Sequence, residues 1–516
     1  MILIWLIVIL FSGGILSLVV GRVNSNLPKW IALATVIINS LVFWSFCSGA
    51  DLKLNIDANA LSHNMAESSV WIVQTSHVWI ERFGISLFFG MDGLSLVLIT
   101  LTLFLGVIAV LSSWSEIEGS SAGFFYFNLL WVLAGVVGVF TALDLFLFFF
   151  FWEVMLIPMY FLISVWGHEN KAYAALKFFI FTQVSGLLML IAILALVFIH
   201  HQQTGQYTFS YIELLNTKTE STAGMLIMLG FFIAFVTKLP GVPVHSWLPD
   251  AHTQAPTAGS VILAGVLLKT GAYGLLRFIF PLFPVAAADF APIAMTLGVV
   301  SILYAAKLAF AQHDIKRLIA YTSISHMGFV LLGIFAWNTL ALQGTVMQMV
   351  AHGVSSAAMF ALAGGIQHRI HTRDLREMGG LWTTVPRTGA IATFFLVAAL
   401  GMPGLGNFIG ETMVLFGAFQ IDPTLTIFAA LGLIIAPVYA LKVIQQAFQG
   451  ELNTQHYDSA KMTNLKPHEL IMMGAMIVAL VGLGVYPQPV IDMVAPAISN
   501  LSEGVAHQLA HLAEPL

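Results

Sequence analysis

The chain has 516 residues, of which 59% are hydrophobic and 9% charged, with a mean hydropathy of +0.91 and a formal net charge of -5. A soluble protein carries about 25% charged residues, so the composition excludes a soluble protein and indicates many membrane spans. The charges form no basic stripe or tail, which argues against nucleic-acid binding. The single cysteine, Cys47, excludes an internal disulfide and a cysteine-ligated iron–sulfur cluster.

Fourteen apolar stretches are long enough to cross a hydrocarbon core about 30 Å thick. They lie at 2–20, 28–47, 88–112, 123–142, 144–165, 173–200, 223–252 (broken), 258–281, 291–311, 316–337, 341–366, 388–420 (broken), 424–449 and 468–487. The first lacks a basic leading segment and a cleavage site, so we expect a retained helix and not a signal peptide.

The basic residues of the loops predict the orientation, because Lys and Arg accumulate on the inner side of a membrane. With the N-terminus outside, eleven basic residues fall in inner loops and four in outer loops. The inner ones are Arg22, Lys29, Lys171, Lys316, Arg317, Arg369, Arg373, Arg376, Arg387, Lys461 and Lys466; the outer ones are Lys53, Arg82, Lys218 and Arg277. An even number of spans then places both termini outside.

One span, at 223–252, is interrupted and leads into a second charged helix that contains Lys269. The polar and helix-breaking residues within and just after this span are Pro240, Pro243, His245, Pro249, Asp250, His252, Gln254 and Pro256. Proline removes a backbone donor and breaks a helix interior, and irregular backbone at membrane depth is tolerated only where it is buried in protein or lines a wet cavity. The segment therefore predicts a path for ions.

A second break lies at 401–411, where glycines and a proline precede Glu411. Paired broken helices are the sequence signal of an inverted-repeat transporter. Lys238 and Glu411 are 173 positions apart, and the same offset carries Glu153 to His326 and Lys269 to Lys442. Each helix maps onto one five places later, so the second unit is expected to be inverted.

Four charged residues, Glu153, Lys238, Lys269 and Glu411, lie inside apolar stretches. A charge at mid-membrane costs about 2.5–3.5 kcal/mol on an insertion scale, and such residues usually mark ion pathways. We interpret Glu153 and Lys238 as a pair that can open and close, with Lys269 at the centre of a relay. The alternatives are an interfacial acid at Glu153, snorkelling of Lys238, and a helix N-terminal acid at Glu411.

Two histidines in apolar helices, His326 and His352, are candidate proton carriers because imidazole titrates near neutral pH. Each could instead be a hydrogen-bonded core histidine. Lys307 and Lys442 are expected to snorkel from inner helix ends, with relay roles as the alternative. Further polar candidates are Asp144, Lys177, His245 and Asp250.

Several segments resemble the antiporter-like membrane subunits of respiratory complex I and of multisubunit cation/proton antiporters. They are FFFFWEVMLIPMYFLI at 148–163, the whole of 238–269, DIKRLIAYTSISHMGF at 314–329, IHTRDLREMGGL at 370–381 and GMPGLGNFIGE at 401–411. Within that family the chain is most similar to the M-type subunit of NADH:quinone oxidoreductase, because the L-type and antiporter subunits tend to carry lysine at the position of Glu411. The sequence departs from the family pattern at Gln367-His368 and at the end of the helix 424–449, where Gln446, Phe448 and Gln449 stand.

The resemblance implies an all-α fold of about fourteen transmembrane helices. It implies helices 1–3 at 1–122, two inverted five-helix repeats at 123–281 and 291–449, each with one broken helix, and a loop, helix 14 and tail at 450–516. It also implies proton translocation through Glu153, Lys238, Lys269 and Glu411, with His326 and His352 on the connecting relay.

The function implied is that of one subunit of a proton-translocating NADH:quinone oxidoreductase in a bacterial inner membrane. NADH, FMN, iron–sulfur clusters and quinone are expected in partner subunits, with no cofactor or metal in this chain, and the partners are other membrane subunits, including neighbouring antiporter-like ones, and lipid. A subunit of a Na⁺/H⁺ antiporter is the alternative. A membrane acyl- or prenyltransferase using His352 or the His245/Asp250 loop lacks a nucleophile or metal motif, and a passive scaffold predicts that Lys269 is dispensable.

Overall fold

The computed structural model describes residues 1–49, 71–453 and 463–513, and most of them are helical. Thirteen helices in those ranges are long and apolar enough to cross a membrane. The remaining predicted span, 388–420, appears as the shorter helices α18 and α19 on either side of a break. The predicted polytopic helical fold is therefore confirmed. The loop charges Lys53 and Lys461 lie outside the described residues.

The first part of the chain forms a bundle of helices and a two-stranded antiparallel hairpin. Its elements are α1 (Ile2–Gly21), α2 (Leu27–Gly49), β1 (Val73–Ile80), a 3-10 turn (Glu81–Phe83), β2 (Ile85–Met91), α3 (Gly93–Ser112), α4 (Ala122–Thr141), α5 (Leu145–Val154), α6 (Leu156–Trp166), α7 (Lys171–Thr204), α8 (Tyr211–Leu214), α9 (Ser221–Lys238) and α10 (Trp247–Gln254).

One long helical path follows and crosses the middle of the molecule. It consists of α11 (Thr257–Ile262), a π segment (Leu263–Leu267), α12 (Leu268–Gly274), a second π segment (Leu275–Ile279) and α13 (Phe280–Leu282). The apolar stretch of Thr257–Leu282 is completely buried inside the protein, whereas helices at the periphery, such as α2, are mostly exposed. A helix that is buried on every side at the centre of a membrane protein is where a charged side chain can be shielded from lipid.

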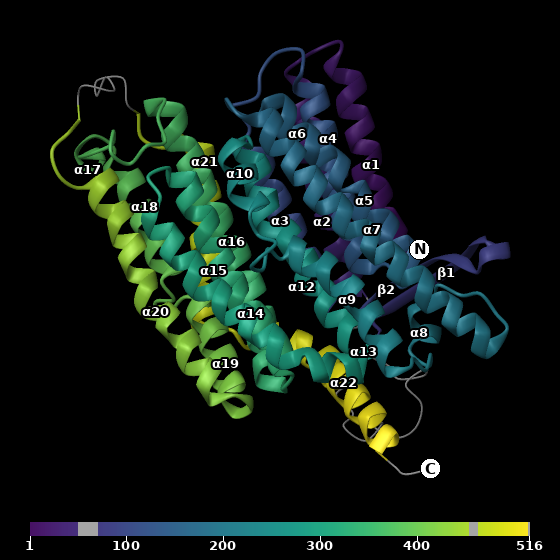
Figure 1. The fold of residues 1–516 in the computed structure, drawn as a ribbon. Helices are drawn as coiled ribbons and strands as arrows, with labels where there is room; N and C mark the ends of the chain where they lie inside the picture. The colour runs from purple at the N-terminus through teal and green to yellow at the C-terminus, as the bar shows by residue number, and fades with distance from the viewer. Residues whose placement is uncertain (50–70, 454–462, 514–516) are drawn as a thin grey trace.

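The second part of the chain packs on the other side of this path (Figure 1). Its elements are α14 (Pro284–Ala311), α15 (Ile315–Ala336), α16 (Thr339–Ile370), α17 (Leu381–Thr384), α18 (Pro386–Ala399), α19 (Gly406–Ile421), α20 (Pro423–Val443), a π segment (Ile444–Phe448), α21 (Pro467–Val485) and α22 (Gln488–Ala513). Figure 1 shows α14–α16 and α18–α20 gathered on one side and α1–α7 on the other.

Three local features differ from the sequence-based expectation. The predicted span 88–112 begins too early, because β2 occupies Ile85–Met91 and pairs antiparallel with β1. The Asp92 side chain then accepts a hydrogen bond from the backbone N of Ser95 (2.9 Å) and so caps α3. The predicted span 144–165 is divided at Met155 into α5 and α6. The predicted C-terminal tail contains α22, which lies beside α13 at one end of the molecule (Figure 1).

Two basic residues assigned to loops are buried. Arg277 lies in the second π segment and forms an ion pair with Asp92, with 2.6 Å between Nη2 and Oδ2. Lys316 lies in the first turn of α15 and is 0% exposed. In both cases tertiary packing buries a residue near the end of a helix, and the sequence alone does not predict that burial.

Candidate functional site

The site begins at Lys269, which lies on α12 between the two π segments and is 0% exposed. Its Nζ donates to the carbonyl oxygen of Ala264 (2.6 Å) and lies 2.8 Å from Nδ1 of His352 on α16. π segments inside helices are rare and often occur at functional sites. The partners of Lys269 in the described part of the chain are a carbonyl and an imidazole, without a carboxylate, so a positive charge on this buried amine is costly and its proton can be released.

A second contact continues the row through the other half of the molecule. His326 on α15 is buried, and its Nδ1 lies 2.7 Å from Oε1 of Glu411 on α19. The rings of His326 and His352 have centroids 5.5 Å apart. Lys269, His352, His326 and Glu411 therefore form one buried row that joins four helices.

The sequence analysis missed Gln348, which belongs to the same group. Its Nε2 donates to Oε1 of Glu411 (2.9 Å), and the residue is 0% exposed. Gly410 allows this contact, because a Cβ there would lie 2.6 Å from the backbone N of Gln348. A glutamine one helical turn from His352 in an apolar helix was the available sequence signal.

The break before α19 shapes the other side of the Glu411 carboxylate. Gly401 has a φ of +71°, and a Cβ at that position would lie 2.8 Å from Oε2 of Glu411. Glycine is the residue that adopts this left-handed conformation at little cost. The interrupted helix therefore brings backbone close to a buried acid, as the sequence pattern suggested.

Glu153 and Lys238 lie in the first half but do not form a closed ion pair. The Nζ of Lys238 has no hydrogen-bond partner among the described residues, and it lies 4.7 Å from the centroid of the Trp152 ring. Glu153 is half-buried and Lys238 is 1% exposed. The aromatic face supplies a cation–π contact, so Lys238 is stabilised while the pair is open.

The two lysines of the site are brought near one another by small residues between α9 and α12. Gly271 lies two residues after Lys269 on α12. A Cβ at Gly271 would lie 2.5 Å from the carbonyl oxygen of Phe235 and 2.7 Å from the backbone N of Leu239. Both atoms belong to the backbone at the end of α9 and cannot swing away. Close approach of these helices therefore requires glycine.

We expect Gly271→Ala to separate α9 from α12 and to destabilise the protein by about 1–3 kcal/mol, as overpacking does. The measurement is the thermal unfolding of the purified complex, followed by the loss of this subunit from it. Gly474→Ala on α21 is the matched control, since a Cβ there meets nothing within 4 Å. Equal melting of the two variants would contradict the packing argument.

The remaining polar candidates occupy the periphery of this row. Lys177 forms an ion pair with Asp250 (2.7 Å), and Asp144 caps α5 by accepting from the backbone N of Phe146 and Leu147. Lys442 donates to the carbonyl oxygens of Phe310 and Gln312 at the end of α14. None of these contacts joins the central row.

Comparison with known proteins agrees with this architecture. Residues 142–436 match the family described as NADH:quinone oxidoreductase/Mrp antiporter, TM. The chain is 53% identical over 508 residues to NADH-quinone oxidoreductase subunit M of Escherichia coli K12, covering 98% of each chain. It is 52% identical over 520 residues to the protein of that name from Pseudomonas aeruginosa, covering 99% of this chain and 100% of the relative.

A similar solved structure is a chain of respiratory complex I from Thermus thermophilus with bound NADH. Its TM-score is 0.83 at 27% identity, covering 98% of this chain and 100% of that one. The fold and the buried row define an antiporter-like membrane subunit. The chain belongs to the NADH:quinone oxidoreductase/Mrp antiporter family, and within it to the subunit M type, which confirms the resemblance inferred from the motifs.

Proposed function

We propose that the chain carries protons across a bacterial inner membrane as the M-type subunit of NADH–quinone oxidoreductase, assembled with the other membrane subunits of that enzyme. The observation that carries this proposal is the buried row itself, in which Lys269 lies 2.8 Å from His352 and His326 lies 2.7 Å from Glu411. Protons would enter near Glu153 and Lys238, pass Lys269 and leave outward through Glu411. NADH, FMN, iron–sulfur clusters and quinone belong to partner subunits.

The row is asymmetric in charge, which supports a direction for transfer. On the first side the carboxylate and the amine are separated, and Lys238 relies on Trp152. On the second side Glu411 is bonded to both His326 and Gln348. A charge that arrives at Lys269 favours loss of a proton elsewhere in the row, because like charges repel strongly in a medium of low dielectric constant. Charge movement in neighbouring subunits can therefore drive proton release.

We further propose that residues 123–281 and 291–449 are two inverted units. In support, each contains a broken helix, and each begins its second helix with an aspartate cap. Asp144 caps α5, which carries Glu153, and Asp314 caps α15, which carries His326. The excess of Lys and Arg in alternate loops supports an orientation with both termini on the outer side.

A Na⁺/H⁺ antiporter assembly is the alternative, and it has weaker support. The relatives that cover nearly the whole chain at 53% and 52% identity are named for NADH–quinone oxidoreductase. The similarity to the Mrp complex of Dietzia, at 20% identity and a TM-score of 0.80, shows only the fold.

The test is the replacement of Lys238 by Ala in the assembled enzyme. We expect NADH-driven proton pumping by sealed membrane vesicles to fall at least about tenfold, equivalent to roughly 1.4 kcal/mol on the barrier, because the buried proton carrier opposite Glu153 is gone. Lys218→Ala, at an exposed outer position, is the control. Normal pumping by Lys238→Ala in a fully assembled complex would reject the proposed function.

A further inference from the structure

The helical path that carries Lys269 ends in a buried polar network on the side that the loop charges assign to the outside. Arg277 lies there, about two turns after Lys269, in the second π segment, and its side chain is buried. The same end of the molecule holds the β1–β2 hairpin, α8 and α13 (Figure 1). The packing around Arg277 therefore determines whether Lys269 can be reached from the outer side.

Four polar side chains form this outer network: Asp92, Ser95, Tyr273 and Arg277. Nη2 of Arg277 donates to Oδ2 of Asp92 (2.6 Å), and Oδ1 of Asp92 accepts from the backbone N of Ser95 (2.9 Å). Oη of Tyr273 accepts from Nε of Arg277 (3.3 Å) and donates to the carbonyl oxygen of Phe140 (3.2 Å). Oγ of Ser95 lies 3.4 Å from Oη of Tyr273. In the described part of the chain, no buried side-chain nitrogen or oxygen of these four residues lacks a partner.

The two charges of the outer network are poorly suited to carry protons. An arginine is not deprotonated in proteins, and Asp92 is 0% exposed and already accepts from the guanidinium and from a backbone N. The ring of Trp71 covers the guanidinium, with its centroid 5.0 Å from Cζ of Arg277. A buried ion pair adds little net stability, because the desolvation of two charges offsets their attraction. A role in transport therefore explains the pair better than a role in stability.

Aromatic rings fill the space beside the outer network. The ring of Phe278, next to Arg277 in the chain, has its centroid 4.8 Å from that of Phe148 on α5 and 5.4 Å from that of Tyr211 on α8. Its centroid lies 6.2 Å from that of Phe235, which precedes Lys238 by one turn of α9. All four rings are buried. They therefore form an apolar layer on the outer side of Lys238.

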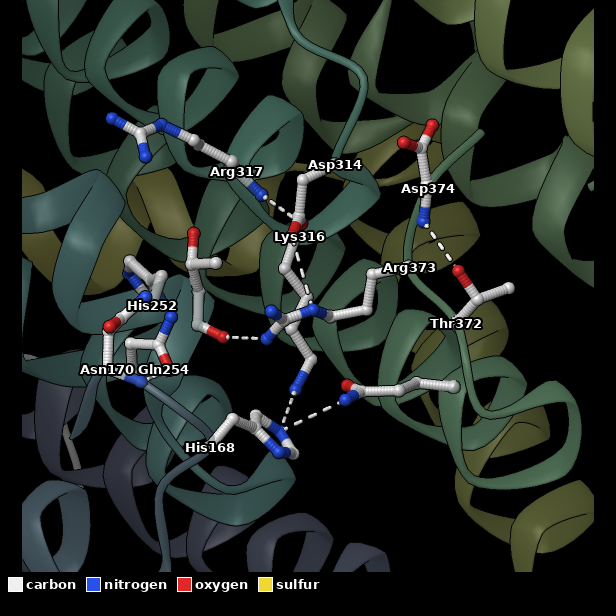
Figure 2. Close-up of polar contacts among 12 residues, drawn as sticks. His168, Asn170, His252, Gln254, Asp314, Lys316, Arg317, Thr372, Arg373 and Asp374 are labelled. Atoms are coloured by element: carbon white, nitrogen blue, oxygen red, sulfur yellow. Dashed lines mark hydrogen bonds and ion pairs between the residues drawn. The ribbon is translucent and has the colours of Figure 1, made fainter. Parts of the chain in front are cut away.

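The inner end of the same helical path is different in kind, because titratable side chains gather there. Figure 2 shows His168, His252 and Lys316 in this region. Nζ of Lys316 lies 3.3 Å from Nε2 of His168, and both ring nitrogens of the buried His252 lack a hydrogen-bond partner among the residues described. Buried polar atoms are almost always paired with protein or with ordered water. The inner groups therefore need water to satisfy them, whereas the outer network is satisfied by protein alone.

We propose that the outer network and the aromatic layer form a barrier that separates Lys238 and Lys269 from the outer aqueous phase. Arg277 and Asp92 then determine the direction of release, because a proton on Lys269 can leave outward only after it has passed to Glu411. This inference rests on the proposed function and adds to it the residues that prevent return flow.

The barrier matters because pumping makes the outer side rich in protons and electrically positive. A hydrated path from that side to Lys238 would let protons return inward through the first half of the chain. NADH oxidation would continue, but fewer protons would be retained for each electron transferred. Loss of the barrier therefore appears as uncoupling, whereas damage to the fold lowers oxidation and pumping together.

The test compares two double variants of the assembled enzyme in sealed liposomes, both of which remove the two charges and retain an amide that can cap α3. Asp92→Asn with Arg277→Ala opens a space beside the rings, and Asp92→Asn with Arg277→Met fills that space with an apolar side chain. We expect an imposed proton gradient, without NADH, to decay at least about tenfold faster in the Ala variant than in the wild type. The Met variant should remain nearly as tight as the wild type, because it still excludes water.

Arg82→Ala, at an exposed arginine near the hairpin, is the control and should not change the decay. The amount of assembled complex and the rate of NADH oxidation are measured for every variant. In the Ala variant we expect oxidation to continue while the number of protons pumped per NADH falls. An assembled Ala variant that holds the imposed gradient as well as the wild type would overturn the proposal.

The outcome for the barrier can be separated from the outcome for the proposed function. If Lys238→Ala stops pumping while the Ala variant at Arg277 does not leak, the barrier is rejected and the proposed function stands. If Lys238→Ala pumps normally, the proposed function is rejected, and the barrier is rejected with it.

Discussion

Replacement of Lys269 by Met is expected to abolish proton pumping while the enzyme still assembles. Lys269 is fully buried at the centre of the molecule, and among the described residues its Nζ forms hydrogen bonds with the Ala264 carbonyl and with His352. Met has a similar length and no charge, so it fills the site without a buried ion. The two halves then lose the group that connects them, and we expect pumping to fall by at least about a hundredfold, or roughly 2.7 kcal/mol.

Lys269→Arg separates two explanations of that loss. Arg keeps the positive charge, but it cannot be deprotonated in proteins. If Lys269 acts by taking up and releasing a proton, Lys269→Arg pumps as poorly as Lys269→Met. If Lys269 supplies only a fixed charge, Arg restores pumping. The measurement is the proton gradient formed by NADH oxidation in sealed vesicles, together with the amount of assembled complex; Lys218→Met serves as the control.

The second large effect is expected from Glu411→Gln. Gln has nearly the same shape as Glu and can still meet His326 and Gln348, which contact Oε1 of Glu411 at 2.7 and 2.9 Å. It cannot carry a proton as a carboxylate does. We therefore expect an assembled enzyme whose pumping is reduced at least about tenfold, with Glu411→Asp retaining part of the activity because the carboxylate remains.

The exposed Glu213→Gln provides the matched control, since it makes the same chemical change outside the row. Normal pumping by Glu411→Gln would show that Glu411 does not carry protons in the pathway and has only a structural role. Poor assembly of Glu411→Gln combined with normal assembly of Glu411→Asp would point to a role in packing α19 against α16, through the contact that Gly410 makes with Gln348.

Much of the fold follows from the sequence because hydrocarbon imposes a simple rule. A membrane helix must be long, apolar and internally hydrogen-bonded, so the spans and the two interruptions could be located directly. The β1–β2 hairpin was missed because its alternation is short and runs into the apolar start of α3. The helix α22 was missed because it was read as a tail after the final span, although it packs within the molecule.

The sequence by itself determined which charges would be costly in a membrane, and so it identified Glu153, Lys238, Lys269 and Glu411. Only the tertiary structure decided which of them meet. It joined Glu411 to His326 and Lys269 to His352, left Glu153 and Lys238 open, and buried Lys316 beside His168. The physical reason is that the cost of burying a charge is local to one residue, whereas its partner is chosen by the packing of helices far apart in the chain.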